Sequence, residues 1–148
     1  MTTIRCILVP TDFSASAAHT LSTAAEFAAT FGARIVLVHV IQPSAYPIRN
    51  LATISGFPNL QQELRKTIER DLADLRRKIP ASIDVVTQIR EGIPHDEILD
   101  CAAEHKCDLI VMATQGLTGL KHALLGSTTE RVVRLSPVPV LTMRHAPD

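Results

Sequence analysis

The sequence has no excess of either charge and no long apolar run. Its 148 residues carry 15 Lys and Arg against 15 Asp and Glu, so the formal net charge is zero. General nucleic-acid or membrane-surface binders usually have a basic excess, and this balance argues against both classes. The longest apolar run, Ile35–Ile41, has the length of a strand and contains His39. A membrane span needs roughly 18 apolar residues, so none is predicted.

Cysteines and targeting signals are also scarce. Cys6, Cys101 and Cys107 are an odd number of cysteines in a chain long enough to need no disulfides, and we interpret them as reduced thiols. The first residues lead directly into an apolar strand pattern and offer no cleavable signal peptide. Hydrophobic residues make up 46% of the chain, which excludes a disordered or fibrous protein. The sequence therefore predicts one compact cytoplasmic domain that spans residues 1–148.

Several familiar catalytic motifs are missing as well. The sequence has no G-x4-G-K-[S/T] loop of the P-loop nucleotide hydrolases, no G-x-S-x-G elbow and no H-E-x-x-H motif. Cys101, His105 and Cys107 are potential metal ligands, but they are only three and no partner pair follows them. We therefore predict neither a catalytic residue nor a metal site built from side chains.

Apolar runs alternate with helical patterns along the chain. We predict strands at Ile4–Val9, Arg34–Ile41, Ile83–Ile89, Asp108–Ala113 and Val138–Met143. We predict helices at Ser14–Phe31, over Leu60–Ile79, from Pro94 onward and at Ser127–Leu135. Parallel strands need crossover helices, so this alternation predicts a doubly wound α/β domain. We expect a five-stranded parallel sheet in the order 3-2-1-4-5, with helices on both faces.

Small and polar residues follow the first and fourth strands. In a doubly wound sheet, ligands bind beyond the carboxyl ends of the strands where the strand order reverses, here between these two strands. Asp12 follows the first strand and offers a carboxylate to a sugar hydroxyl or an amine. The fourth strand leads to Gly126, Ser127, Thr128 and Thr129 at the start of a helix. Glycine lets the backbone approach phosphate, and a helix start supplies N–H donors. The pattern predicts a nucleotide site.

Each of these residues has an alternative, purely structural role. Asp12 is of a type that commonly caps helices, and Gly116 and Gly126 are of the type found in turns. The two glycines stand before three consecutive hydroxyl residues, and that combination favours phosphate binding over a plain turn.

The same residues resemble the universal stress protein family across nearly the whole chain. The resemblance lies in Ile7–Ser14, His39-Val40, Gly92-x-Pro94, Ala113–Gly116 with Gly126-Ser127, and Pro137–Leu141. The ATP-binding branch of that family is marked by G-x2-G-x9-G-[S/T]. Gly116, Gly126 and Ser127 match this motif, and Ala113 stands at its first glycine. One added methyl reduces the room for a ligand but keeps the backbone amides in place.

The resemblance implies a set of ligand contacts. Adenosine would be held by Pro10, Thr11, Asp12 and Val40. The ribose and phosphate side would be lined by Met112, Ala113, Gly116, Gly126, Ser127, Thr128 and Thr129. The implied cofactor is ATP, with Mg²⁺ or Mn²⁺ on the phosphates, and the implied role is that of a nucleotide-responsive stress regulator. Phosphoryl transfer needs charge stabilisation, and no Lys or Arg falls inside these segments, so we predict at most a slow ATPase.

The last strand, Val138–Met143, is apolar and lies at an edge in the predicted order. An exposed apolar edge strand promotes aggregation unless another strand pairs with it. Pairing with the same strand of a second copy, related by two-fold symmetry, would cover it. Pro139 removes one donor, which an edge strand tolerates. Members of the resembled family form dimers through the last strand, so a homodimer is predicted.

Alternatives to the ATP-binding regulator stay open. One is a non-nucleotide-binding dimeric interaction module of the same fold, in which Ala113 marks a lost site. Another is a sensor of AMP or another adenosine ligand. A third is an enzyme, either an ATP hydrolase or a thiol-dependent redox protein.

Overall fold

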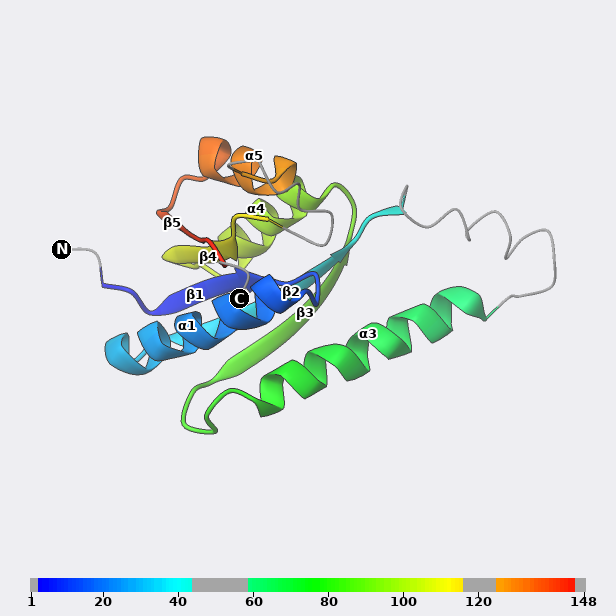
Figure 1. The fold of residues 1–148 in the computed structure, drawn as a ribbon, viewed down its shortest axis with the longest axis horizontal. Helices are drawn as coiled ribbons and strands as arrows, with labels where there is room; N and C mark the ends of the chain where they lie inside the picture. Colours follow the sequence, from blue (N-terminus) through cyan, green and yellow to red (C-terminus); the bar gives the residue numbers. More distant parts are fainter. Residues whose placement is uncertain (1–2, 44–58, 116–124, 146–148) are drawn as a thin grey trace.

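Five parallel strands form one sheet in the order β3-β2-β1-β4-β5 (Figure 1). The computed structural model describes residues 3–43, 59–115 and 125–145. The strands are β1 (Cys6–Pro10), β2 (Arg34–Ile41), β3 (Val85–Glu91), β4 (Leu109–Ala113) and β5 (Val140–Met143). The predicted strand order is confirmed.

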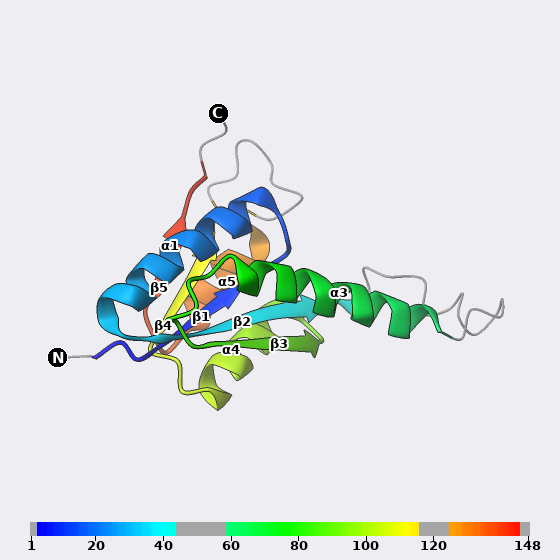
Figure 2. The same cartoon turned by 90° about the horizontal axis from the view of Figure 1, so that it is seen from below.

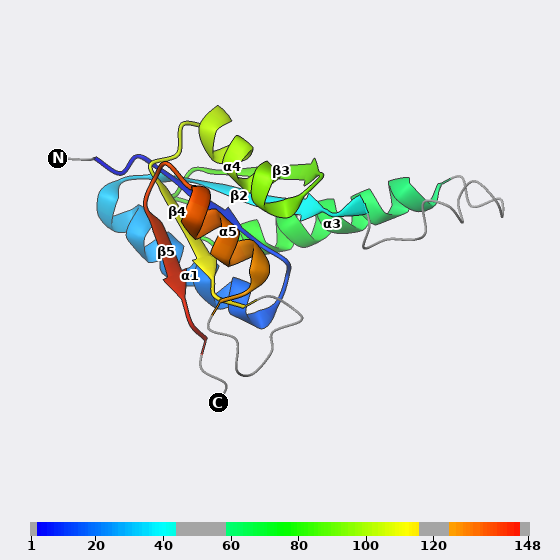
Figure 3. The same cartoon turned by 90° about the horizontal axis from the view of Figure 1, so that it is seen from above.

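Helices cover both faces of this sheet. They are α1 (Ala15–Phe31), α3 (Leu60–Arg77), α4 (Pro94–Glu104) and α5 (Ser127–Leu135). Helices α1 and α3 lie on one face, which Figure 2 shows from their side. Helices α4 and α5 lie on the other face, which is turned to the viewer in Figure 3. None of the helices in the described ranges is long and apolar enough to cross a membrane.

The sheet is buried on both sides, so it separates two apolar cores. Along β1, Ile7 and Val9 pack toward α1 and α3, whereas Cys6 and Leu8 pack toward α4 and α5. Successive residues of a strand point to opposite faces, and here both faces are covered. This is why the central strands are continuously apolar instead of alternating with polar residues.

Helix α1 begins and ends at the residues that the sequence indicates. The Ser14 hydroxyl accepts a hydrogen bond from the Ala17 backbone N–H, which caps the helix. Gly32, the residue after the predicted end at Phe31, has φ +67° and donates its N–H to the Ala28 carbonyl, which forms a left-handed cap. Between the caps, alanines such as Ala24 lie fully buried against the sheet.

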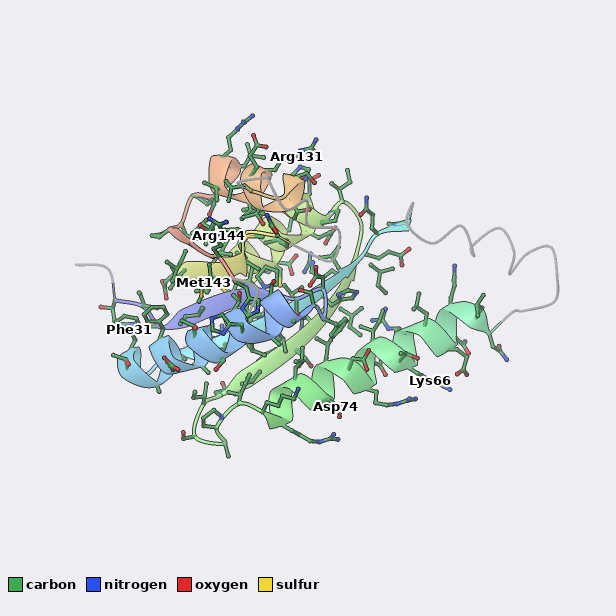
Figure 4. The ribbon with its side chains drawn as sticks, viewed as in Figure 1. Phe31, Lys66, Asp74, Arg131, Met143 and Arg144 are labelled. Carbon is green, nitrogen blue, oxygen red and sulfur yellow. The ribbon has the colours of Figure 1, made fainter. Side chains whose placement is uncertain are left out.

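Helix α3 presents a charged face to solvent. Lys66 and Asp74 lie on its side away from the sheet (Figure 4). Lys66 pairs with Glu63 at 3.8 Å, one turn away, and both side chains are about two-thirds exposed. Such solvated pairs contribute little to stability, so the buried face, with Ile68 and Leu72, anchors this helix.

Strands β1 and β3 end at Pro10 and Glu91, later than predicted, and β4 begins at Leu109 and not Asp108. Three strands begin two residues later than predicted, each because hydrogen bonds hold the preceding residues outside the strand. Strand β1 begins at Cys6 and not Ile4, since the Arg5 N–H turns to the Asp108 carboxylate at 2.8 Å. Strand β3 begins at Val85 and not Ile83, since the Ile83 N–H closes a turn onto Pro80. Strand β5 begins at Val140 and not Val138, because the Ser136 hydroxyl binds both the N–H and the carbonyl of Val138.

Candidate functional site

The carboxyl ends of β1 and β4 meet at the point where the strand order reverses. The two strands pair in parallel, with Ile7 opposite Leu109 and Leu8 opposite Ile110. The residues that follow β1 and those that follow β4 therefore emerge at the same edge of the sheet. Figure 3 shows the end of β4, the start of α5 and the link from β1 to α1 at this edge.

The segment after β1 is held by its own short polar side chains. Thr11 is 6% exposed, and its N–H donates to the Val38 carbonyl at 2.8 Å. Its hydroxyl accepts from the Phe13 N–H at 3.1 Å, and the Asp12 carboxylate accepts from the Ser14 N–H at 3.0 Å. The cap of α1 is therefore Ser14, and Asp12 shapes the turn before it. Asp12 is half-buried at the strand end.

Phe13 and His39 belong to this edge, although the sequence pattern did not single them out as ligand contacts. Phe13 has φ +63°, a left-handed conformation that is uncommon for a bulky residue. Its ring lies 4.7 Å from the His39 ring, centroid to centroid. The His39 Nδ1–H donates to the Thr11 carbonyl at 2.8 Å. One available signal was the polar His39 within the apolar run Ile35–Ile41.

Gly126 joins the start of α5 to the end of β4. Its N–H donates to the Thr114 carbonyl at 2.6 Å, and it is the N-cap residue of α5. Its φ of −65° is open to any residue, so the left-handed region is not the reason for a glycine here. A Cβ atom at this position would lie 3.3 Å from the Thr114 carbonyl oxygen. Glycine therefore serves close approach of two backbone segments.

The three hydroxyl residues after Gly126 differ in their surroundings. Ser127 is exposed and Thr128 is half-buried at the first turn of α5. Thr129 is 4% exposed, and its hydroxyl donates to the Ala113 carbonyl at 2.9 Å. The Thr129 side chain thus ties α5 to β4, while Ser127 and Thr128 lie nearer the solvent.

The remaining predicted contacts are spread around the same edge. Pro10 and Val40 are half-buried at the ends of β1 and β2, and Val40 packs against the core under α4 and α5. Met112 is 5% exposed within that core, so its side chain serves packing. Gly116 lies outside the described residues.

Asp12 supplies the acidic side chain of the described segments that frame the site. Asp12 is the one ionisable residue in the segments 10–12, 113–115 and 125–129 of the sequence. Within residues 3–43, 59–115 and 125–145, no group of three or more His, Cys, Asp or Glu side chains is placed to hold a metal ion. A ligand with several negative charges would meet backbone N–H groups and hydroxyls at the α5 end.

A cavity of about 510 Å³ lies at the same edge of the sheet but beyond β2 and β3. Its lining includes Ile41, Glu91 and the first turns of α3. Ligands of such sheets bind where the strand order reverses, which is between β1 and β4. The candidate site therefore lies there, and this cavity is adjacent to it.

Comparison with known proteins identifies the family. The chain matches the Universal stress protein family over residues 3–144. It is 31% identical to universal stress protein MJ0531 of Methanocaldococcus jannaschii over 139 residues, which is 93% of this chain and 81% of that protein. It is 30% identical to MJ0577 of the same organism, with 94% of each chain covered. The solved structure of MJ0577 has a TM-score of 0.84 and covers 99% of this chain and all of its own.

Two further structures of the same fold hold adenine nucleotides. One is a universal stress protein in complex with cAMP, at 24% identity and a TM-score of 0.70, covering 97% of this chain and 98% of its own. The other, from Archaeoglobus fulgidus in complex with dAMP, has 20% identity and a TM-score of 0.63, covering 95% and 98%. At these identities the likeness is one of fold. Strand order, near-complete coverage and the family match agree, and the chain belongs to the universal stress protein family.

Proposed function

We propose that this protein binds ATP between the ends of β1 and β4 and acts as a nucleotide-responsive regulator. The observation that carries the proposal is the hydrogen bond from the Gly126 N–H to the Thr114 carbonyl, which is 2.6 Å long. This contact holds the start of α5 beside the end of β4, where the sheet order reverses. Backbone N–H groups at a helix start attract phosphate through hydrogen bonds and the helix dipole.

The two sides of the edge suit the two ends of a nucleotide. The phosphates lie at the α5 end, where Ser127 and Thr128 add hydroxyl donors to the backbone N–H groups. The nucleoside lies at the β1 end, where the Asp12 carboxylate accepts from a ribose hydroxyl or the adenine amine. Related proteins of this fold bind cAMP and dAMP, which supports an adenine nucleotide as the ligand class.

A divalent cation fits this site only when it is bound together with the phosphates of the nucleotide. Hard cations prefer oxygen ligands, and segment 125–129 offers the hydroxyls of Ser127 and Thr128. The carboxylate in the first turn of α5, that of Glu130, pairs with Arg134 at 2.6 Å. Mg²⁺ or Mn²⁺ would therefore be held mainly by phosphate oxygens. No Lys or Arg lies in segments 10–12, 113–115 or 125–129 to stabilise a phosphoryl transition state, and this favours regulation over rapid hydrolysis.

We also propose a homodimer that forms through β5. The carbonyl of Pro139 accepts from the N–H of Ile110 in β4, and the carbonyl of Met143 accepts from the N–H of Thr114, the residue after β4. Backbone groups of a parallel strand alternate in direction, so those of Val140 and Thr142 point away from β4. An antiparallel copy of β5 would satisfy them. The cytoplasmic location expected from the sequence stays a prediction.

Calorimetric titration of nucleotide-free protein with Mg-ATP, and with AMP for comparison, tests the ligand. Micromolar binding, about −8 kcal/mol, with a preference for ATP supports the proposal. A preference for AMP would replace it with a sensor of AMP. Absence of heat and of thermal stabilisation at millimolar ATP would leave the non-binding dimeric module.

Substitutions at Gly126 test the position of the phosphates. Gly126→Asp places a carboxylate at the helix start, and we expect affinity for ATP to fall by more than about a hundredfold, the equivalent of about 2.7 kcal/mol. Gly126→Ala is the matched control, because it adds the same Cβ atom, 3.3 Å from the Thr114 oxygen, without charge. Equal losses in both variants would mean crowding and not charge, and unchanged affinity in Gly126→Asp would refute the site. Thermal unfolding of both variants verifies that they fold.

A further inference from the structure

Two of the three cysteines lie together at the opposite end of the sheet from the nucleotide site. Cys6 is the first residue of β1, and Cys107 lies just before β4. Their Sγ atoms are 3.1 Å apart although the residues are 101 positions apart in the chain. The parallel pairing of β1 with β4 brings them together. Cys6 is 3% exposed and Cys107 is 5% exposed.

The backbone around both cysteines is held in place from several sides. The Asp108 N–H donates to the Cys6 carbonyl at 2.8 Å, and the Asp108 carboxylate accepts from the Cys6 N–H at 3.0 Å. The Cys107 N–H donates to the Ala102 carbonyl at 2.8 Å. The sulfurs are closer than the about 3.5–4.0 Å at which carbon atoms pack. An S–S bond is about 2.05 Å long, so the two sulfurs would have to move about 1 Å closer together. Rotation about the side-chain torsions of the two cysteines can provide so small a movement.

The two thiols have unequal surroundings. The pKa of Cys6 is lowered because it accepts a hydrogen bond from the Cys107 thiol and lies near the Arg34 guanidinium, against the opposing effects of burial and Asp108. The pKa of Cys107 is raised, first by its hydrogen bond to Cys6 and then by burial. Cys101, on α4, is fully buried, and burial raises its pKa to about 11. Cys6 is therefore the sulfur favoured as thiolate, and Cys107 is held as its thiol partner.

We propose that Cys6 and Cys107 form a reversible disulfide, with a hydroperoxide as the oxidant and a small dithiol as the reductant. This proposal does not rest on nucleotide binding. The bond would join β1 to β4, the same two strands whose other ends carry the candidate nucleotide site. Cys101 takes no part in it.

The oxidation proceeds by two displacements. The Cys6 thiolate attacks one oxygen of the hydroperoxide, so an S–O bond forms, the O–O bond breaks, and the other oxygen leaves as an alcohol or water with a proton from solvent. The Cys107 sulfur then attacks the sulfenic sulfur of Cys6, so the S–S bond forms and the oxygen leaves as water with the Cys107 proton. The thiols lose two electrons and the peroxide gains them. A dithiol reverses the reaction by thiol–disulfide exchange and becomes a disulfide itself.

Hydrogen peroxide treatment of the folded, fully reduced protein tests this proposal. We expect two of the three thiols to disappear, the intact mass to fall by two hydrogens, and peptide mapping to join Cys6 to Cys107. Dithiothreitol restores both thiols. A native protein that keeps all its thiols, a disulfide mapped to Cys101, or a disulfide only between chains would overturn the proposal.

Single variants assign the roles of the two sulfurs. With Cys107→Ser, dimedone should trap a sulfenic acid at Cys6, whereas with Cys6→Ser peroxide consumption should be at least about tenfold slower. Cys101→Ser is the matched control and should form the disulfide as the natural chain does. Equal peroxide reactivity in the Cys6→Ser and Cys107→Ser variants would contradict the assigned roles. Peptide mapping of the peroxide-treated natural chain shows whether the disulfide forms, even if one of the variants fails to fold.

Discussion

Phe13 shows how much the candidate site depends on single residues. Its φ of +63° lies in a region that costs an L-residue roughly 1–2 kcal/mol, and strained conformations of this kind gather at functional sites. Thr11 and Asp12 accept hydrogen bonds from the N–H groups of Phe13 and Ser14, and the His39 ring contacts the Phe13 ring. The turn that places Asp12 at the sheet edge is held by these contacts against the strain.

A pair of substitutions at Phe13 measures this strain. Phe13→Ala and Phe13→Gly both remove the ring, but only glycine adopts a positive φ without penalty. We expect the glycine variant to be more stable than the alanine variant by about 1 kcal/mol in urea unfolding, although glycine usually costs stability relative to alanine. An alanine variant that is the more stable of the two would show that Phe13 is not strained.

At the scale of elements, Arg90 joins β3 to α4 through two carboxylates. Its Nε donates to Glu97 at 2.7 Å, and its two terminal nitrogens donate to Glu104 at 2.7 and 3.1 Å. The Arg90 side chain is 17% exposed, so this group is shielded more than the ion pairs on α3. The carboxylates hold the pKa of Arg90 above its ordinary value, so it stays charged at any physiological pH.

This ion pair predicts a pH dependence of stability. The Arg90 guanidinium lowers the pKa of Glu104 from its usual value of 4.5. A carboxylate with a lowered folded pKa contributes stability above its unfolded pKa and loses it as the pH falls through the folded pKa. We therefore expect Glu104→Gln to lower Tm at pH 7, with a difference from the natural chain that shrinks as the pH falls below about 4.5.

The control for Glu104→Gln is Glu69→Gln on α3. Glu69 pairs with Arg65 at 3.7 Å, and both side chains are more than half exposed. Pairs of this kind contribute little, so Tm should hardly change at either pH. A Tm difference for Glu104→Gln that stays constant from pH 7 to pH 3 would mean that the residue acts by packing and not by charge.

At the scale of the molecule, β5 is an edge of the sheet with its outer backbone groups directed away from β4. Its four residues are all half-buried in the single chain, and Leu141 and Met143 pack on the core under α1. A short apolar edge of this kind pairs readily with another strand. A homodimer built on it would extend the sheet across the two copies.

Thr142→Pro tests this dimer without disturbing the bonds between β4 and β5. Proline removes the Thr142 N–H, which points outward, and edge strands tolerate proline. We expect the natural chain to sediment as a dimer and the proline variant as a monomer with a similar circular dichroism spectrum. Thr142→Val keeps the N–H and should stay dimeric. A dimeric proline variant would place the interface elsewhere.

The class of fold, the strand order and the extent of helix α1 were predictable from the sequence alone. These follow from local periodicity, from the burial of both sheet faces and from the rules of parallel connections. The site segments after β1 and β4 were also predictable, because parallel topology alone places them at one edge.

The contacts that these residues make could be read only from the folded structure. The Thr129 hydroxyl donates to the Ala113 carbonyl, and the His39 ring donates to the Thr11 carbonyl. Gly126 lets its backbone lie close to the Thr114 carbonyl. The strand order alone places Cys6 and Cys107 before adjacent strands, but the 3.1 Å contact of their sulfurs is seen only in the folded chain. Local periodicity reports which face of an element is buried, but the pairing of side chains across strands depends on register and on the exact approach of segments that are distant in the chain. The physical reason is that these contacts exist only once the sheet has formed.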